Sequence, residues 1–242
     1  MIVQNRKLWV DSVDLSGHLN GMAFDASHEM ADDTVFGDSA RSSLPGLEDF
    51  TLQHEGIWLG GTGGPDTVAM ANRSLANVLA TLTPVNGSEG AIAYFMLTTE
   101  GAYSFGGKVG DLHQFSVDLK ASGGFPAIRG TLMTNGTKSA TGSSAAKTQL
   151  GAVSATQKLY AGLHVLAVTG TTPTLDVIVR SDANSSPGSE TTRITFGQKT
   201  AIGSEWATPI AGAITDTYWD IAWTIGGTSS PTFQIVVVVG IQ

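Results

Sequence analysis

The sequence predicts a mainly β protein, built as a β-sandwich or barrel with one flanking α-helix. Three observations predict this class. Most segments alternate apolar and polar residues with a period of two, as half-buried strands do. Glycine is frequent, at 30 of 242 residues, which suits the many turns of a β protein. Only one stretch of the chain has helical spacing, so helices are a minor component.

The clearest strands lie in both halves of the chain. Residues 115–120 and 175–180 carry apolar side chains at alternating positions. Residues 218–225 and 232–239 are rich in aromatic and β-branched residues, and the Gly-Gly turn between them predicts a hairpin. The last of these strands is apolar on both faces. It should therefore be central in a sheet or covered by a partner.

One segment predicts a helix. We expect about three to four turns near residues 66–79, with Asp66 as the N-cap. The apolar residues that recur at helical spacing, and that should pack against a sheet, are Val68, Ala71, Leu75, Val78 and Leu79. The glycine-rich residues 60–64 precede this helix, but no lysine follows them as a phosphate-binding loop would require. A turn is the better interpretation.

A run of small and polar residues divides the chain. Residues 134–146 have no apolar periodicity, which is typical of a loop or linker. The predicted organisation is a first β-sandwich over residues 1–133, a linker over 134–150 and a second β-sandwich over 151–242. Both halves carry a turn with Asp, an alternating strand, a Gly-Gly turn and a closing strand. A divergent tandem duplication and coincidence both explain this order.

Charge and composition exclude several classes of protein. The chain has 13 Lys and Arg against 21 Asp and Glu, a net charge of −8. The acidity lies in residues 1–125, with 15 acidic against 6 basic residues. A basic surface that binds the phosphate backbone of nucleic acid is therefore not expected. The chain has no cysteine. It has neither a signal-peptide-like start nor an apolar run of about 20 residues, so we expect a protein made in the cytoplasm and no membrane partner.

The candidate chemical groups predict neither an enzyme, a cofactor nor a metal site. No pair of histidines has metal-ligand spacing, and no Ser lies in a G-x-S-x-G elbow. Paired carboxylates suggest a glycosidase or a Ca²⁺ site, but the aromatic platform of a sugar site is lacking. The histidines are His18, His28, His54, His113 and His164. The carboxylate pairs are Asp32 with Asp33, Glu48 with Asp49, and Asp11 with Asp14.

A set of short motifs in a fixed order points to a family. The chain reads DLSG at residues 14–17, TVFGD at 34–38 and PGLED at 45–49, and the last of these leads into a strand. In this order the motifs resemble the tail tube (major tail) proteins of long-tailed, siphovirus-like bacteriophages. The resemblance is good over residues 8–133 and moderate over the remainder. It implies the β fold of the phage tail-tube type and places the single helix near residues 66–79.

The resemblance also implies a function. The chain would be a virion structural protein, made in the host cytoplasm and located in the tail. Its subunits would form rings, with a trimer slightly favoured over a hexamer, and stacked rings would conduct DNA during ejection. The implied partners are further copies of the chain, tail tip and terminator proteins, and a tape measure protein in the lumen. DNA would pass through without sequence-specific binding, because acidic walls repel phosphates.

The segment between residues 24 and 50 would be the long loop or hairpin that reaches the neighbouring ring. Its residues suit polar contacts between rings: Asp32, Asp33, Phe36, Asp38, Arg41, Glu48 and Asp49. Two other interpretations stay open at this point. One is a carbohydrate-binding β-sandwich module, and the other is a capsid decoration or tail-terminator protein.

Overall fold

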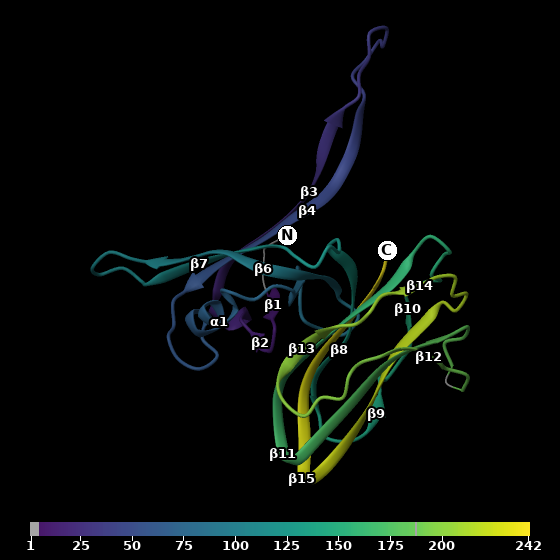
Figure 1. Ribbon diagram of the computed structural model, residues 1–242. Helices are drawn as coiled ribbons and strands as arrows, with labels where there is room; N and C mark the ends of the chain where they lie inside the picture. Colours follow the sequence, from purple (N-terminus) through teal and green to yellow (C-terminus); the bar gives the residue numbers. More distant parts are fainter. Residues whose placement is uncertain (1–4, 187) are drawn as a thin grey trace. The chain divides into compact units, whose positions relative to one another are not determined.

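The computed structural model describes residues 5–186 and 188–242 (Figure 1). The prediction of a mainly β protein is confirmed, with one α-helix among the described residues. No helix in these ranges is long and apolar enough to cross a membrane. The elements are β1 (Lys7–Val10), β2 (Val13–Asp14), a 3-10 turn η1 (Ser16–His18), β3 (Leu19–Asp32), β4 (Ser43–Ile57), α1 (Pro65–Asn72), β5 (Val78–Thr83), β6 (Ile92–Gly106), β7 (Gln114–Ala121), β8 (Ile128–Lys138), β9 (Gly142–Ser143), β10 (Thr148–Gln149), β11 (Lys158–Asp182), β12 (Thr191–Thr195), β13 (Gly203–Trp206), β14 (Ile210–Ala211) and β15 (Tyr218–Ile241).

The chain forms two compact units that alternate along the sequence. The sandwich unit contains the described residues 5–17, 78–96, 128–186 and 188–242, and the hairpin unit contains 18–77 and 97–127. These units do not coincide with the predicted halves 1–133 and 151–242. Strand β8 continues past residue 133, and β9 and β10 lie within the segment predicted as a linker, 134–150. Because long-range strand pairing decides compactness, a local composition change did not mark the boundary.

Two long bent strands build the sandwich unit. The first half of β11 pairs with the second half of β15, and the second half of β11 pairs with the first half of β15. Both strands bend where residues adopt positive φ, at Gly170 and Thr172 in β11 and at Gly227, Ser229 and Ser230 in β15. The ribbon therefore folds back on itself into two layers (Figure 1). The predicted hairpin of residues 218–225 with 232–239 is wrong, since both segments pair with β11 instead.

The main core lies between these two layers. Its residues alternate along both halves of β11 and β15, as the period of a strand requires. They include Leu159, Ala161, Leu163 and Val165 from one half of β11, Leu175, Val177 and Val179 from the other, Trp219, Ile221 and Trp223 from one half of β15, and Phe233, Ile235, Val237 and Val239 from the other.

The last strand is apolar on both faces because both are covered. The second half of β15 lies between β11 and β8, and Val236 and Val238 are as fully buried as the residues facing the main core. On the opposite side of the same layer, β5 approaches β11: Thr81 Oγ1 lies 2.8 Å from His164 Nε2. The prediction that this strand is central and covered is confirmed.

The hairpin unit is built on an antiparallel sheet. Strand β4 pairs with both β3 and β7, and β7 pairs with the second part of β6. Beyond the sheet, β3 and β4 continue together as a long two-stranded hairpin (Figure 1). Helix α1 packs against β7. The order of strands in this unit is therefore β3-β4-β7-β6.

The helix is shorter than predicted. It spans Pro65–Asn72, has Gly64 as its N-cap and places Pro65 in its first turn; Asp66 lies inside that turn and makes no cap bond. Of the five predicted packing residues only Val68 is a buried residue of the helix, while Ala71 and Leu75 are exposed. Val78 and Leu79 are buried in strand β5. A positive φ at Asn77 turns the chain between the two elements, and a short apolar run has no periodicity that distinguishes strand from helix.

Candidate functional site

The sheet of the hairpin unit has one packed face and one open face. On the packed face Leu52 is paired with Leu119 and His54 with Val117, and these residues are buried. The alternate residues point to the other side, where most side chains are small or polar and at least partly exposed. This open face consists of Gly21, Ala23, Asp25 and Ser27 on β3, Asp49, Thr51, Gln53, Glu55 and Ile57 on β4, Gln114, Ser116, Asp118 and Lys120 on β7, and Ala102, Ser104 and Gly106 on β6.

The open face is acidic, and so is its unit. It carries four carboxylates, Asp25, Asp49, Glu55 and Asp118, against one cation, Lys120. The whole hairpin unit has 12 acidic residues (Asp and Glu) against 4 basic ones (Lys and Arg). The sandwich unit has nine acidic and nine basic residues. The net charge of −8 therefore belongs entirely to the hairpin unit. Such a surface repels phosphate groups at low and moderate salt.

The β3–β4 hairpin holds all seven residues predicted for the contact between rings. Asp32, Asp33, Phe36, Asp38 and Arg41 lie at its exposed end, while Glu48 and Asp49 lie on β4 nearer the sheet. Glu48 accepts a hydrogen bond from the Ala127 amide at 3.3 Å. Asp49 belongs to the open face, so we treat it with that face and not with the residues at the tip.

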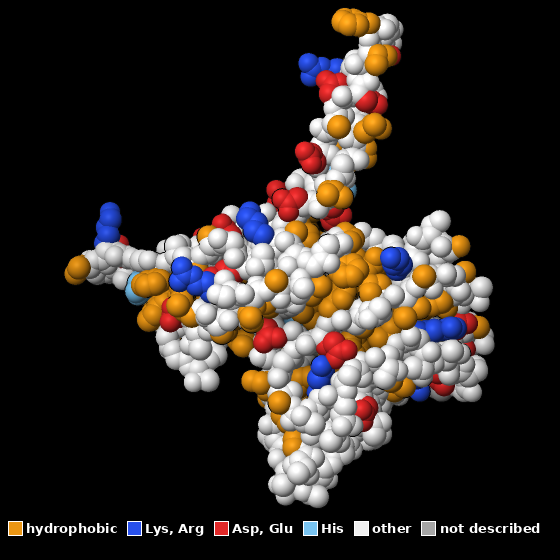
Figure 2. Space-filling view, viewed as in Figure 1, with side chains coloured by type: hydrophobic (Ala, Val, Ile, Leu, Met, Phe, Trp, Pro, Cys, Tyr) orange, Lys and Arg blue, Asp and Glu red, His pale blue; other side chains and the backbone are white. Residues whose placement is uncertain are grey.

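The tip of the hairpin is ordered by its own hydrogen bonds. Asp32 accepts bonds from the Thr34 amide and hydroxyl at 3.0 and 2.5 Å, and these bonds lower the pKa of its carboxyl. Asp38 accepts a bond from the Val35 amide at 3.0 Å. Large apolar side chains stand exposed along the same hairpin among the acidic groups (Figure 2); these are Met30, Val35, Phe36, Leu44 and Leu47. Contiguous exposed apolar groups are typical of surfaces that contact another molecule.

A polar link fixes the helix to the packed side of the sheet. Tyr103 on β6 donates a hydrogen bond to Asp66 at 2.6 Å and accepts one from the indole of Trp58 at 3.1 Å. Burial and the bond to Asp66 raise the pKa of Tyr103 to about 12. Asp66, predicted as a helix cap, therefore serves as the acceptor of this link. His54 is buried on the packed face against Phe115, and burial lowers its pKa to about 4.

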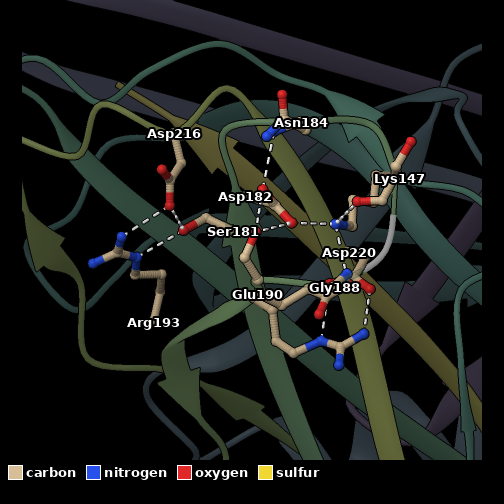
Figure 3. A network of polar contacts seen from close by, with 12 residues as sticks. Lys147, Ser181, Asp182, Asn184, Gly188, Glu190, Arg193, Asp216 and Asp220 are labelled. Atoms are coloured by element: carbon tan, nitrogen blue, oxygen red, sulfur yellow. Dashed lines mark hydrogen bonds and ion pairs between the residues drawn. The ribbon is translucent and has the colours of Figure 1, made fainter.

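A charged network at one end of the sandwich unit supports its loops (Figure 3). The Lys147 ammonium lies 2.5 Å from Asp182 and 3.0 Å from Glu190, and it donates to the Ser186 carbonyl at 2.8 Å. The bond from Lys147 and then that from the Asn184 amide lower the pKa of Asp182 to about 2. Arg193 pairs with Asp216 at 3.0 Å. Each of these charged groups therefore already has a partner of opposite charge within the sandwich unit.

The remaining candidate groups of the sequence are dispersed. In the described ranges no group of three or more His, Asp or Glu could hold a metal ion. Asp11 accepts a hydrogen bond from Ser204 at 2.7 Å, and Asp14 pairs with Lys7 at 3.6 Å. His164 lies buried between Thr81 and the Asp11 carbonyl. Sequence reasoning missed Asp25, Glu55 and Asp118 of the open face. The period-two alternation of residues 49–57 and 114–120 was the signal that would have grouped the last two.

Comparisons with known proteins give only distant matches. No family model and no curated protein matches the chain. Among solved structures, a chain from the virion of a native gene transfer agent aligns with a TM-score of 0.38 and 10% identity, over 46% of this chain and 84% of that one. A chain of the sheath/tube terminator structure of the extracellular contractile injection system PVC aligns with a TM-score of 0.42 and 12% identity, over 51% of this chain and 93% of that one. The Dit protein of phage SPP1, a hub adsorption apparatus, aligns with a TM-score of 0.36 and 9% identity, over 99% of this chain and 100% of that one. At these TM-scores the likenesses assign neither a family nor a function to this chain.

Proposed function

We propose that the chain is a structural protein of a bacteriophage tail, located in the virion, whose copies assemble into rings that stack as the tail tube. In this role the protein has no catalytic activity. Its partners are further copies of itself, a terminator, tail tip proteins and a tape measure protein, and DNA passes through the lumen during ejection. The sequence motifs at residues 14–17, 34–38 and 45–49 support the family, as described above.

The observation that carries the proposal is the open face of the hairpin unit. A four-stranded sheet that is packed on one side and lined by small, polar and acidic groups on the other is suited to form a wall of an aqueous channel. Its four carboxylates against one cation would keep DNA from adhering as it slides. Within this role, the lumen is lined by Asp25, Asp49, Glu55 and Asp118.

The β3–β4 hairpin provides the contact to a second copy. It extends beyond its sheet with residues exposed on both faces and with five large apolar side chains unburied. Isolated two-stranded hairpins are at best marginally stable in water, so this element gains from being covered. In a stack of rings the hairpin would bridge from one ring to the next.

The size of the ring depends on the second half of the chain. A trimer supplies six tube-like units if residues 151–242 repeat the tube fold, whereas a hexamer is needed if they decorate the outside. We propose the trimer, as the resemblance described above slightly favours. Three-fold symmetry in averaged electron micrographs is the expected result, and a clear six-fold average would contradict it.

Negative-stain electron microscopy of the purified full-length protein tests the function. Rings or tubes with a central hole, increasing with protein concentration, are the expected result. A protein that remains a dispersed monomer at high concentration would contradict the proposal. Rings that never stack, even at the highest concentration, would instead indicate a terminator protein.

A further inference from the structure

A second exposed surface lies on the sandwich unit, at the pairing of β6 with β8. Strands β6 and β8 pair here, with Tyr94 opposite Arg129 and Ile92 opposite Thr131. Thr131 is also opposite Val239 of β15, whose side chain faces the main core. Directly paired residues share a face, so these four residues continue the core-facing side of the sheet into solvent. We call Ile92, Tyr94, Arg129 and Thr131 the shelf.

The shelf has the composition of a protein-binding surface. Ile92 is 42% exposed, Arg129 is exposed, and Tyr94 and Thr131 are half-buried. Tyrosine and arginine are among the residue types that contribute most to protein interfaces. In the described ranges no carboxylate pairs with the Arg129 guanidinium. Most other cations of the sandwich unit have an acidic partner, as Lys138, Lys147, Arg180, Arg193 and Lys199 do.

We propose that the shelf of one copy binds the tip of the β3–β4 hairpin of a second copy. The inference rests on the proposed function and names the surface that receives the hairpin. The tip combines the exposed Val35 and Phe36 with Asp32, Asp33 and Asp38, all exposed. Its apolar residues match Ile92 and Tyr94, and its carboxylates match the unpaired guanidinium. The shelf and the tip are different surfaces, so the contact is heterologous and propagates from copy to copy.

Charge decides between the possible sites on a second copy. The hairpin unit carries a net charge of −8, so a tip with three carboxylates is repelled by the hairpin unit of another copy. The sandwich unit is neutral overall, and Arg129 gives its shelf a local positive charge. Arginine binds carboxylates with two parallel hydrogen bonds, which also fixes the register of the contact.

Photo-crosslinking locates the contact directly. Phe36→p-benzoylphenylalanine is introduced into the full-length protein, which is irradiated under assembling conditions and digested for mass spectrometry. Crosslinks between copies to peptides containing residues 92–94 or 129–131 are the expected result. Crosslinks between copies that map to other residues of the chain would overturn the assignment of the shelf.

Charge exchange tests the pairing. Arg129→Glu should weaken association of copies at least about tenfold in analytical ultracentrifugation, and Asp32→Arg with Asp33→Arg should restore much of it. Lys158→Glu is the matched control, because Lys158 precedes Leu159 on β11 and so faces the opposite side of the sheet. Equal association of wild type and Arg129→Glu would overturn the inference while leaving ring formation intact. A wild-type protein that never associates would overturn the proposed function as well.

Discussion

Arg180 and Asp220 face each other directly across β11 and β15, with Arg180 Nε 3.0 Å from Asp220 Oδ1 and a second guanidinium nitrogen bonded to the other carboxylate oxygen. The Asp220 side chain is only 5% exposed. A bidentate pair of this kind satisfies a carboxylate that burial would otherwise strongly disfavour. The pair therefore fixes the register of the second half of β11 against the first half of β15.

Arg180→Met should destabilise the protein by about 3 kcal/mol, because it leaves Asp220 buried without its counter-ion. The double variant Arg180→Met, Asp220→Leu should recover most of this loss, since it removes the orphaned charge. Urea denaturation measures both. Lys7→Met is the control: Lys7 and Asp14 lie 3.6 Å apart with side chains 38% and 34% exposed, so its loss should cost less than about 1 kcal/mol. Equal effects of Arg180→Met and Lys7→Met would contradict this account.

Two buried histidines should make stability depend on pH. Burial lowers the pKa of His54 and of His164 to about 4, below the ordinary value near 6.5. The unfolded chain therefore binds these protons more readily than the folded one. The contribution of these neutral histidines to the free energy of unfolding is fully present above about pH 6.5. It falls as the pH is lowered towards 4, by up to about 1.4 kcal/mol per pH unit for each histidine.

Denaturation curves at pH 7.5, 6 and 5 measure this slope. His54→Phe and His164→Asn should each make the free energy of unfolding less sensitive to pH over this range, whatever their effect at pH 7.5. His28→Asn is the control, because His28 is exposed on the β3–β4 hairpin. If His28→Asn reduces the pH dependence of the free energy of unfolding as much as the other two variants do, the pH dependence does not come from the buried histidines.

Gly130 allows β15 to approach β8 closely. A Cβ at this position would meet the Val239 carbonyl of β15, with Gly240 Cα 3.0 Å away. Because these are backbone atoms, they cannot move aside without disturbing the pairing. Gly130→Ala should therefore destabilise the protein by roughly 1–3 kcal/mol. Gly106→Ala, also in a strand but with no atom within 4 Å of its Cβ, should be nearly neutral in the same thermal melts.

The sequence predicted what depends on local patterns and missed what depends on distant partners. The strands at residues 115–120 and 175–180, the existence of a helix and the central position of residues 232–239 followed from periodicity and apolarity. The partner of β15 did not follow from these patterns. Each half of β15 pairs with β11, and the turn residues fit a bend as well as a hairpin. Leu79 was assigned to the helix for a similar reason, because its burial in β5 comes from tertiary packing.

The candidate site was predictable only in part. The location of the acidity in residues 1–125 anticipated an acidic surface, and the hairpin of residues 24–50 contains the predicted Asp32, Asp33 and Asp38. Asp25, Glu55 and Asp118 come from three strands that lie side by side only after pairing. No single stretch of the sequence contains all the residues of the open face, so a search for local motifs does not find it.

Reversing the charge of the open face should turn a surface that repels DNA into one that retains it. Tubes assembled from the variant Asp25→Lys, Glu55→Lys, Asp118→Lys should co-sediment with short double-stranded DNA at low salt and release it as salt rises, because the binding would be electrostatic. Wild-type tubes should leave the DNA in the supernatant. The same triple change at the hairpin tip, Asp32→Lys, Asp33→Lys, Asp38→Lys, alters the net charge equally. It should impair stacking, and any tubes that it still forms should not retain DNA. Retention by the tip variant alone would place the tip in the lumen and move the open face to an outer surface.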